Sequence, residues 1–301
     1  MTIHSLRAQR PSAGSHADVL YVHGSTFGAG LSIFYPLDGR SWADALNDAG
    51  FTAWGFDFAG YGDSARYPVD SGRAVGRLEE AVPQLLRVIR AVRERNGGRP
   101  VFLLGHSWGA TVAAACAAAH PDGIAALVLF APIVTRAGAT RPAGAYIPAA
   151  AAAMSAPSHY PLTLWAQYRR FVEDVPRGQP QVLGEAHFQA WGEAFLATDP
   201  ESRSRTPPAV STPVGPQRDV QALWSGQELY DPARIAAPTL LVRGEWDTVC
   251  DADDAASLLA DLGAAARHSA VIERATHLMH LEAQRGLLYD AVNTFLLGSA
   301  S

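Results

Sequence analysis

The stretch Val101-Phe-Leu-Leu-Gly-His-Ser-Trp-Gly109, followed by an alanine-rich run, decides the fold of this chain. The apolar residues 101–104 predict a buried strand, and residues 111–119, rich in strong helix formers, predict a helix. Between them lies the pattern G-x-S-x-G, which in this context predicts a tight, strained turn with Ser107 at its tip. A helix N-terminus there would favour developing negative charge. The alternative is a glycine-rich turn with an incidental serine, which only the rest of the chain can exclude.

The length and composition of the chain predict one large globular unit, or one with an insertion. It has 301 residues, of which 48% are hydrophobic, and a formal net charge of −5. With no basic stripe, nucleic acid is not an expected partner. The N-terminal ten residues lack the apolar segment of a secretory signal, and no run is long enough to cross a membrane.

The two cysteines, Cys116 and Cys250, cannot form a disulfide framework, so we expect a reducing, cytoplasmic setting. Cys116 lies in the alanine-rich segment and is expected to be buried. Cys250 follows a strand near an acidic loop, where partial exposure is expected.

Apolar strands alternate with amphipathic helices over most of the chain. Strands are expected at 18–22, 52–58, 101–104, 124–130, 238–243 and 269–273, and helices at 39–49, 76–95, 111–119, 253–262 and 281–297. This alternation predicts an α/β fold with a doubly wound, mostly parallel sheet of about eight strands, covered on both faces.

The alternation lapses in one long segment. Residues 1–131 and 238–301 are therefore predicted to form the core domain, and residues 132–237 a mainly helical cap inserted over the sheet. No convincing strand is visible in that insertion. Residues 203–218, which contain four prolines, are expected to form an extended loop or mobile flap.

Two loops at later strand ends carry the groups that would activate a serine. A serine hydroxyl is a weak nucleophile and needs a base, usually an imidazole oriented by a carboxylate. Asp247 follows the strand near 240–242 and is the preferred acid, with Glu245 as the fallback. His277 follows the last strand and is the preferred base, whereas His280 is expected to pack or cap a helix. The strand, tight turn and helix around Ser107 match a nucleophile elbow. The chain order Ser107, Asp247, His277 is the order typical of that motif.

An oxyanion requires two backbone donors. The N–H of Trp108 should supply one, and the loop after His23-Gly24 the other, with Ser25 preferred and Thr26 possible. His23 itself is expected to be structural.

Substrate contacts are predicted at five residues: Thr26, Phe27, Trp108, Trp165 and Trp191. For the aromatic residues of the insertion, the alternative is that they form its own hydrophobic core.

No His, Cys, Asp and Glu grouping has metal-ligand spacing, and Gly24 to Gly30 does not open a helix as a dinucleotide-binding turn would. We therefore expect no metal and no cofactor.

Taken together, these motifs resemble the α/β-hydrolase-fold enzymes that carry a helical cap. The features that support the resemblance, in the family's order, are His23-Gly24, Asp57-Phe-Ala-Gly-Tyr-Gly-Asp-Ser64, Gly105-His-Ser-Trp-Gly109, Gly244-Glu-Trp-Asp247 and Thr276-His277. The resemblance implies a serine hydrolase, similar to esterases and thioesterases, that acts through an acyl-enzyme on a small or medium apolar or aromatic ester or thioester.

Several branches of that family fit less well. Ser107 stands where dehalogenases and epoxide hydrolases carry Asp, and His106 stands where the aminopeptidase branch usually has Gly. Carbon–carbon bond hydrolases favour a richer Gly-Pro loop after His-Gly. An acyltransferase, or a thioesterase that releases or cyclises a carrier-bound chain, remains an alternative on the same residues, as does a non-catalytic binding protein. An acyl carrier is then a possible partner, and the sequence leaves the oligomeric state open.

Overall fold

The structure is a computed structural model, and it describes residues 6–11, 17–68, 71–136 and 157–300. A seven-stranded sheet crosses the described part of the chain, where about eight strands were expected. Its strands, in spatial order, are β1 (Arg7–Gln9), β3 (Phe51–Gly55), β2 (Ala17–Val22), β4 (Val101–His106), β5 (Ile124–Phe130), β8 (Thr239–Gly244) and β9 (Arg267–Ile272). Only β1, at one edge, runs antiparallel to its neighbour. The predicted mostly parallel α/β sheet is confirmed.

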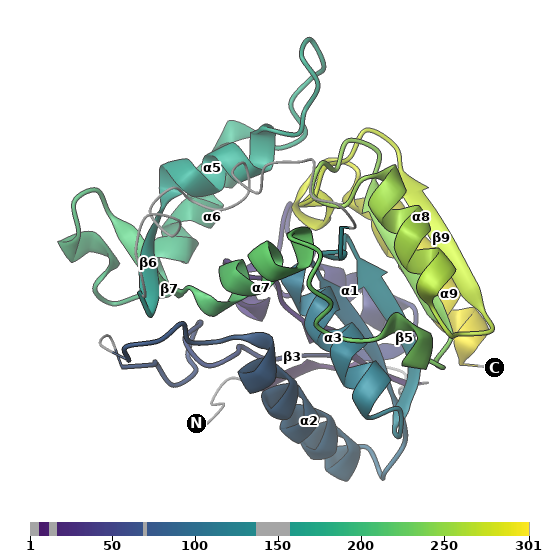
Figure 1. Cartoon of the computed structure of the whole chain (residues 1–301). Coiled ribbons are helices and arrows are strands. Elements are labelled where there is room, and N and C mark those ends of the chain that lie inside the picture. The colour runs from purple at the N-terminus through teal and green to yellow at the C-terminus, as the bar shows by residue number, and fades with distance from the viewer. Residues whose placement is uncertain (1–5, 12–16, 69–70, 137–156, 301) are drawn as a thin grey trace.

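Helices cover both faces of this sheet (Figure 1). One face packs on α2 (Leu78–Arg95), α3 (Trp108–Ala119) and α8 (Ala252–Asp261), and the other on α1 (Trp42–Asp48) and α9 (Arg285–Ser299). Strand β2 shows why a continuous apolar run is needed. Leu20 and Val22 belong to one hydrophobic cluster, while Val19 and Tyr21 belong to the other. Both faces are therefore buried, as expected for a parallel sheet.

The insertion contains strands that sequence reasoning missed. Strands β6 (His159–Thr163) and β7 (Ala209–Pro213) pair antiparallel, beside helices α5 (Leu164–Val172) and α6 (Glu185–Ala197). In β6 the buried Tyr160 and Leu162 alternate with exposed Pro161, a pattern too short to predict a strand with confidence from sequence.

The expectation of a loop or flap at 203–218 is wrong. This stretch includes β7 and the beginning of α7 (Gly215–Trp224), and its prolines lie at element boundaries. Pro213 ends the strand, and Pro216 lies in the first turn of the helix, where proline is tolerated. Proline content alone therefore did not distinguish a loop from a strand–helix junction.

Helix α7 packs on the core although it lies inside residues 132–237. Its Val220, Leu223 and Trp224 join the same hydrophobic cluster as α2 and α3. By contrast, α5, α6 and the β6–β7 ribbon share a separate cluster with Phe27. The division of the chain into a core and a cap stays a prediction.

Polar contacts join α6, within residues 132–237, to segments earlier in the chain. The guanidinium of Arg66 donates to the carbonyls of Gly60 and Gly62 and to that of Thr198 at the end of α6. At the other end of α6, His187 lies 2.8 Å from a carboxylate oxygen of Asp38. Both ends of α6 are thus bonded to residues outside the segment 132–237.

The turn between β4 and α3 has the strained geometry that the sequence predicts. Ser107 has φ 55° and ψ −124°, a region that residues other than glycine rarely adopt. A Cβ on Gly109 would lie 2.2 Å from the carbonyl oxygen of His23, and one on Gly105 would lie 2.6 Å from the Cα of Ala110. Both glycines are therefore required by close backbone packing.

We predict that Gly109→Ala destabilises the fold by about 2 kcal/mol or more, because backbone atoms must move to admit the methyl group. Urea unfolding followed by circular dichroism measures this loss. Gly298→Ala is the matched control, since nothing lies within 4 Å of a Cβ there and the residue is helical. The control should leave stability equal or slightly higher. An unchanged urea midpoint in Gly109→Ala would contradict the packing argument.

Candidate active site

Three residues that are far apart in the chain meet at the carboxyl ends of the strands. Ser107 follows β4, Asp247 follows β8, and His277 follows β9. These strands lie in the order β4, β5, β8, β9 and run parallel, so their carboxyl ends share one edge of the sheet. The structure brings together all three residues that sequence reasoning selected.

Hydrogen bonds join the three side chains in a row. Ser107 Oγ lies 2.8 Å from His277 Nε2, and His277 Nδ1 lies 3.0 Å and 3.2 Å from the two carboxylate oxygens of Asp247. All three side chains are buried. With Nδ1–H donating to Asp247, Nε2 is left to accept the proton of the serine hydroxyl.

Asp247 is held in its ionised form despite its burial. Burial opposes ionisation, but the neighbouring His277 and the backbone N–H of Cys250 outweigh it, so the pKa of Asp247 is lowered. Val249 N–H donates to the same carboxylate at 2.8 Å, and Cys250 N–H at 3.0 Å. The fallback acid Glu245 instead accepts from the backbone N–H of Arg274.

The loop that follows β2 approaches the elbow closely, as an oxyanion site requires. A Cβ on Gly24 would lie 3.4 Å from Cβ of Ser107. Ser25 is buried, and its carbonyl accepts a hydrogen bond from the Tyr61 hydroxyl. Trp108 is the first residue of α3, so its N–H has no partner within that helix. The two predicted donors therefore lie on segments that flank Ser107.

Two further histidines close to His277 are uncharged packing residues. His280 is buried against His106 and Phe130, and burial lowers its pKa to about 3. His106 stacks on Phe130, and its Nε2 lies 3.1 Å from the carbonyl of His277. Burial holds the pKa of His106 well below its ordinary value. The expected packing role of His280 is confirmed.

His23 is also structural, as expected. Its Nε2 accepts from the N–H of Phe58, and its Nδ1 lies 2.7 Å from the carbonyl of Gly24. Both ring nitrogens are therefore used in fixing the loop that leads to Ser25.

Sequence reasoning did not single out Glu282, which is fully buried beneath the loop that carries His277. Its carboxyl accepts hydrogen bonds from the backbone N–H of Thr276, at 3.0 Å, and from the Thr276 hydroxyl. Burial raises its pKa to about 7. A glutamate directly after Leu278-Met-His-Leu281, a stretch with three apolar residues, was the available signal.

The prediction that the Trp108 side chain contacts substrate is not supported by its position. The side chain is fully buried, its ring packs edge-on against Phe58, and its Nε1–H donates to Asp219 at 3.0 Å. Sequence spacing placed Trp108 beside the nucleophile but could not show that its side chain points into the core.

The other predicted substrate residues have different surroundings. Phe27 and Trp191 are buried and meet edge-on, with ring centroids 5.0 Å apart, and the indole N–H of Trp191 donates to the carbonyl of Leu31. Thr26 is half-buried. Trp165 is 68% exposed and stacks on Tyr168. The contact of Phe27 with Trp191 thus joins the loop after β2 to α6.

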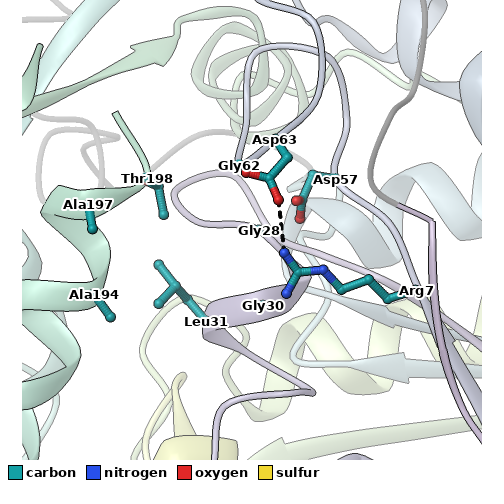
Figure 2. A pocket seen from close by; sticks show the side chains of 10 residues that line it. All are labelled: Arg7, Gly28, Gly30, Leu31, Asp57, Gly62, Asp63, Ala194, Ala197 and Thr198. Atoms are coloured by element: carbon teal, nitrogen blue, oxygen red, sulfur yellow. Dashed lines mark hydrogen bonds and ion pairs between the residues drawn. The ribbon is translucent and has the colours of Figure 1, made fainter. Parts of the chain in front are cut away.

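A cavity of about 210 Å³ lies behind that loop (Figure 2). Its lining residues are Arg7, Gly28, Gly30, Leu31, Asp57, Gly62, Asp63, Ala194, Ala197 and Thr198. Figure 2 shows the Arg7 guanidinium bonded to the carboxylate of Asp63. The other lining carboxylate, Asp57, accepts a hydrogen bond from the backbone N–H of Ala29 at 2.8 Å. Ser107, Asp247 and His277 do not line this cavity.

Cys250 is fully buried, which corrects the expectation of partial exposure, because the turn after Asp247 folds its side chain into the core.

Within the described residues, no three His, Cys, Asp or Glu side chains group as metal ligands. In the same part of the chain, no helix combines the length and apolar character that a bilayer crossing demands.

We predict that Glu282 makes the stability of the fold fall as pH rises from about 4.5 to 7. In this window the folded protein retains a proton that the unfolded chain has released, because burial raises the folded pKa of Glu282 to about 7. Glu282→Gln removes this proton linkage. Relative to the wild type, the variant should therefore gain stability as pH rises, by roughly 2–3 kcal/mol at most. Urea unfolding at pH 5 and pH 7.5 measures the change, and an equal difference at both values would contradict it.

Two curated proteins match parts of this chain in sequence. Epoxide hydrolase B of Mycobacterium tuberculosis is 34% identical over 97 residues, which are 31% of this chain and 25% of that protein. The lysophosphatidylserine lipase of Macaca fascicularis is 32% identical over 101 residues, or 34% of this chain and 22% of that protein. The chain thus spans about a quarter of the length of these curated relatives.

Similarity in fold extends over nearly the whole chain. The structure of an esterase from Exiguobacterium antarcticum superimposes with a TM-score of 0.66, covers 97% of each chain and is 18% identical in sequence. In addition, the sequence model of the family described as serine aminopeptidase, S33, matches residues 39–284. The chain therefore belongs to this hydrolase family, of the α/β-hydrolase fold.

Proposed function

We propose that this protein is a serine hydrolase that cleaves a carboxylic ester or thioester through an acyl-enzyme. The observation that carries the proposal is the hydrogen-bonded row of Ser107, His277 and Asp247 at a strained elbow. A serine at a nucleophile elbow, with an imidazole at 2.8 Å and a buried carboxylate behind it, has the arrangement that activates a hydroxyl.

In the proposed mechanism, Ser107 Oγ attacks the substrate carbonyl carbon while His277 Nε2 takes the hydroxyl proton. Asp247 holds the imidazole in the required tautomer and stabilises the imidazolium that forms. The backbone N–H groups of Trp108 and Ser25 stabilise the oxyanion. His277 then protonates the leaving alcohol or thiol as the tetrahedral intermediate collapses. Water, deprotonated by His277, hydrolyses the acyl-enzyme and regenerates Ser107.

The proposed substrate is a small or medium ester with an apolar or aromatic group. Support comes from the aromatic contact of Phe27 and Trp191 between the loop after β2 and the insertion. The sequence relatives include a lipase and an epoxide hydrolase. We favour ester cleavage because the residue at the elbow is Ser107, and not the Asp that the resemblance associates with epoxide hydrolases. A cytoplasmic location belongs to the same proposal.

We predict that Ser107→Ala and His277→Ala each lower kcat for a p-nitrophenyl ester by about a thousandfold or more, because each removes the nucleophile or its base. The double variant should lose little beyond either single variant, since the two groups act as one unit. Ser204→Ala, at an exposed serine outside the elbow, is the control and should match the wild type. Wild-type turnover in folded Ser107→Ala would refute the proposal.

Transfer of the acyl group to an alcohol, amine or carrier is the second candidate function, because the acyl-enzyme can react with any nucleophile that reaches it. Product analysis with increasing concentrations of an added alcohol separates the two. For a hydrolase, we expect the free acid to remain the main product. A dominant transesterified product at millimolar alcohol would favour the transferase.

A further inference from the structure

The carboxylate of Asp219 is a buried anion that the proposed mechanism does not use. It projects from α7, is fully buried, and accepts three hydrogen bonds from two other segments. Its Oδ1 receives Arg77 Nε–H at 2.8 Å, and its Oδ2 receives Leu78 N–H at 2.8 Å and Trp108 Nε1–H at 3.0 Å. One side chain thus joins α7, the start of α2 and the nucleophile elbow.

Two of these hydrogen bonds have a clear structural purpose. Arg77 is the N-cap residue of α2 and makes no side-chain capping bond of its own. Asp219 replaces the missing cap, since it accepts from the first N–H of the helix, and Arg77 balances its charge. Even with these donors, burial raises the pKa of Asp219 above its ordinary value.

The third hydrogen bond is not needed to cap α2. It goes to Trp108, the residue directly after Ser107 and the source of a proposed oxyanion donor. The indole ring is enclosed in the core and packs edge-on against Phe58, with ring centroids 5.3 Å apart. The bond to Asp219 then fixes the rotation of the ring, and with it the direction of the Cα–Cβ bond at the first residue of α3.

Asp219 itself is held on a firmly packed helix. The N–H of Gly215, at the start of α7, donates to the carbonyl of Val75 at 2.9 Å, and a Cβ there would lie 2.4 Å from the same oxygen. Two residues later, Gln217 donates to the hydroxyl of Tyr160 in β6 at 2.6 Å. The carboxylate therefore has a defined position relative to both the core and the β6–β7 ribbon.

We propose that Asp219 is a positioning residue that aligns the backbone N–H of Trp108 with the oxyanion by holding the Trp108 indole. This inference rests on the proposed function, because the oxyanion forms only during attack by Ser107. Because the oxyanion is present only in the transition state and intermediate, loss of alignment should lower kcat and leave KM nearly unchanged.

The test compares variants that separate the indole bond from the helix cap. Trp108→Phe removes the indole donor and part of the buried ring volume, keeps an aromatic ring against Phe58, and leaves the cap of α2 in place. Asp219→Ala removes the acceptor together with the cap, and Trp108→Phe/Asp219→Ala combines the two. Arg77→Gln is the matched control, since it removes the ion pair of Asp219 and leaves the bond to Trp108 intact. Urea unfolding measures the stability of each variant.

Two rates are measured on folded protein. The first is kcat for a p-nitrophenyl ester, normalised to titrated active sites. The second is the rate at which a fluorophosphonate probe labels Ser107. This reaction also depends on stabilisation of an oxygen on phosphorus, and it can be measured without knowing the natural substrate. Full removal of an oxyanion donor costs about 10²–10³ in rate, so misalignment should cost less.

We expect Trp108→Phe and Asp219→Ala each to lower both rates about tenfold, with KM changed less than about twofold. The double variant should be no slower than Asp219→Ala by more than about twofold, because both changes break the same bond. Arg77→Gln should lose stability and keep both rates.

Equal rates in Trp108→Phe and the wild type would overturn the inference and leave Asp219 only as the cap of α2. Equal losses of rate in Arg77→Gln and Asp219→Ala would overturn it too. If the wild type labels with the probe but turns over no ester, the proposed ester substrate fails, while the labelling rates still decide the role of Asp219.

Discussion

The close contact between the β4–α3 turn and the end of β2 is the constraint on which the site depends. Gly109 lies so near the carbonyl oxygens of Val22 and His23 that no side chain fits between them. This approach places the loop after His23 directly beside Ser107, which has a positive φ at the tip of the turn. The strain at Ser107 is compensated by the packing of the surrounding core, where α3 is buried along nearly its whole length.

Behind the elbow, uncharged or tightly bonded polar groups support the His277 loop. His106 contacts the carbonyl of His277, Glu282 holds the N–H and hydroxyl of Thr276, and Asp247 accepts two backbone N–H groups besides the imidazole. Burial keeps His106 and His280 neutral, so neither histidine adds a positive charge beside His277. The low-dielectric surroundings strengthen the Asp247–His277 interaction and restrict the imidazole to one orientation.

Helix α7 gives the insertion a structural role in the core. It follows the β6–β7 ribbon, yet its apolar residues pack with α2 and α3, and its Asp219 binds the start of α2 and the indole of Trp108. The remainder of residues 157–237 forms a separate, largely aromatic cluster that also includes Phe27, Leu31, Leu278 and Leu281. Polar contacts at the two ends of α6 add to this packing. Residues of this segment therefore reach both Trp108, next to Ser107, and Phe27, in the loop after β2.

The sequence by itself determined the parallel sheet, the elbow and the selection of Ser107, Asp247 and His277, because these depend on local signals: buried apolar runs, glycines that permit a tight turn, and polar residues at strand ends. Tertiary structure alone decided where the side chain of Trp108 points, why Glu282 is buried, and that residues 203–218 form a strand and the start of a helix. These features depend on partners up to 111 residues away, such as Asp219 for Trp108, and spacing along a chain carries no information about such contacts.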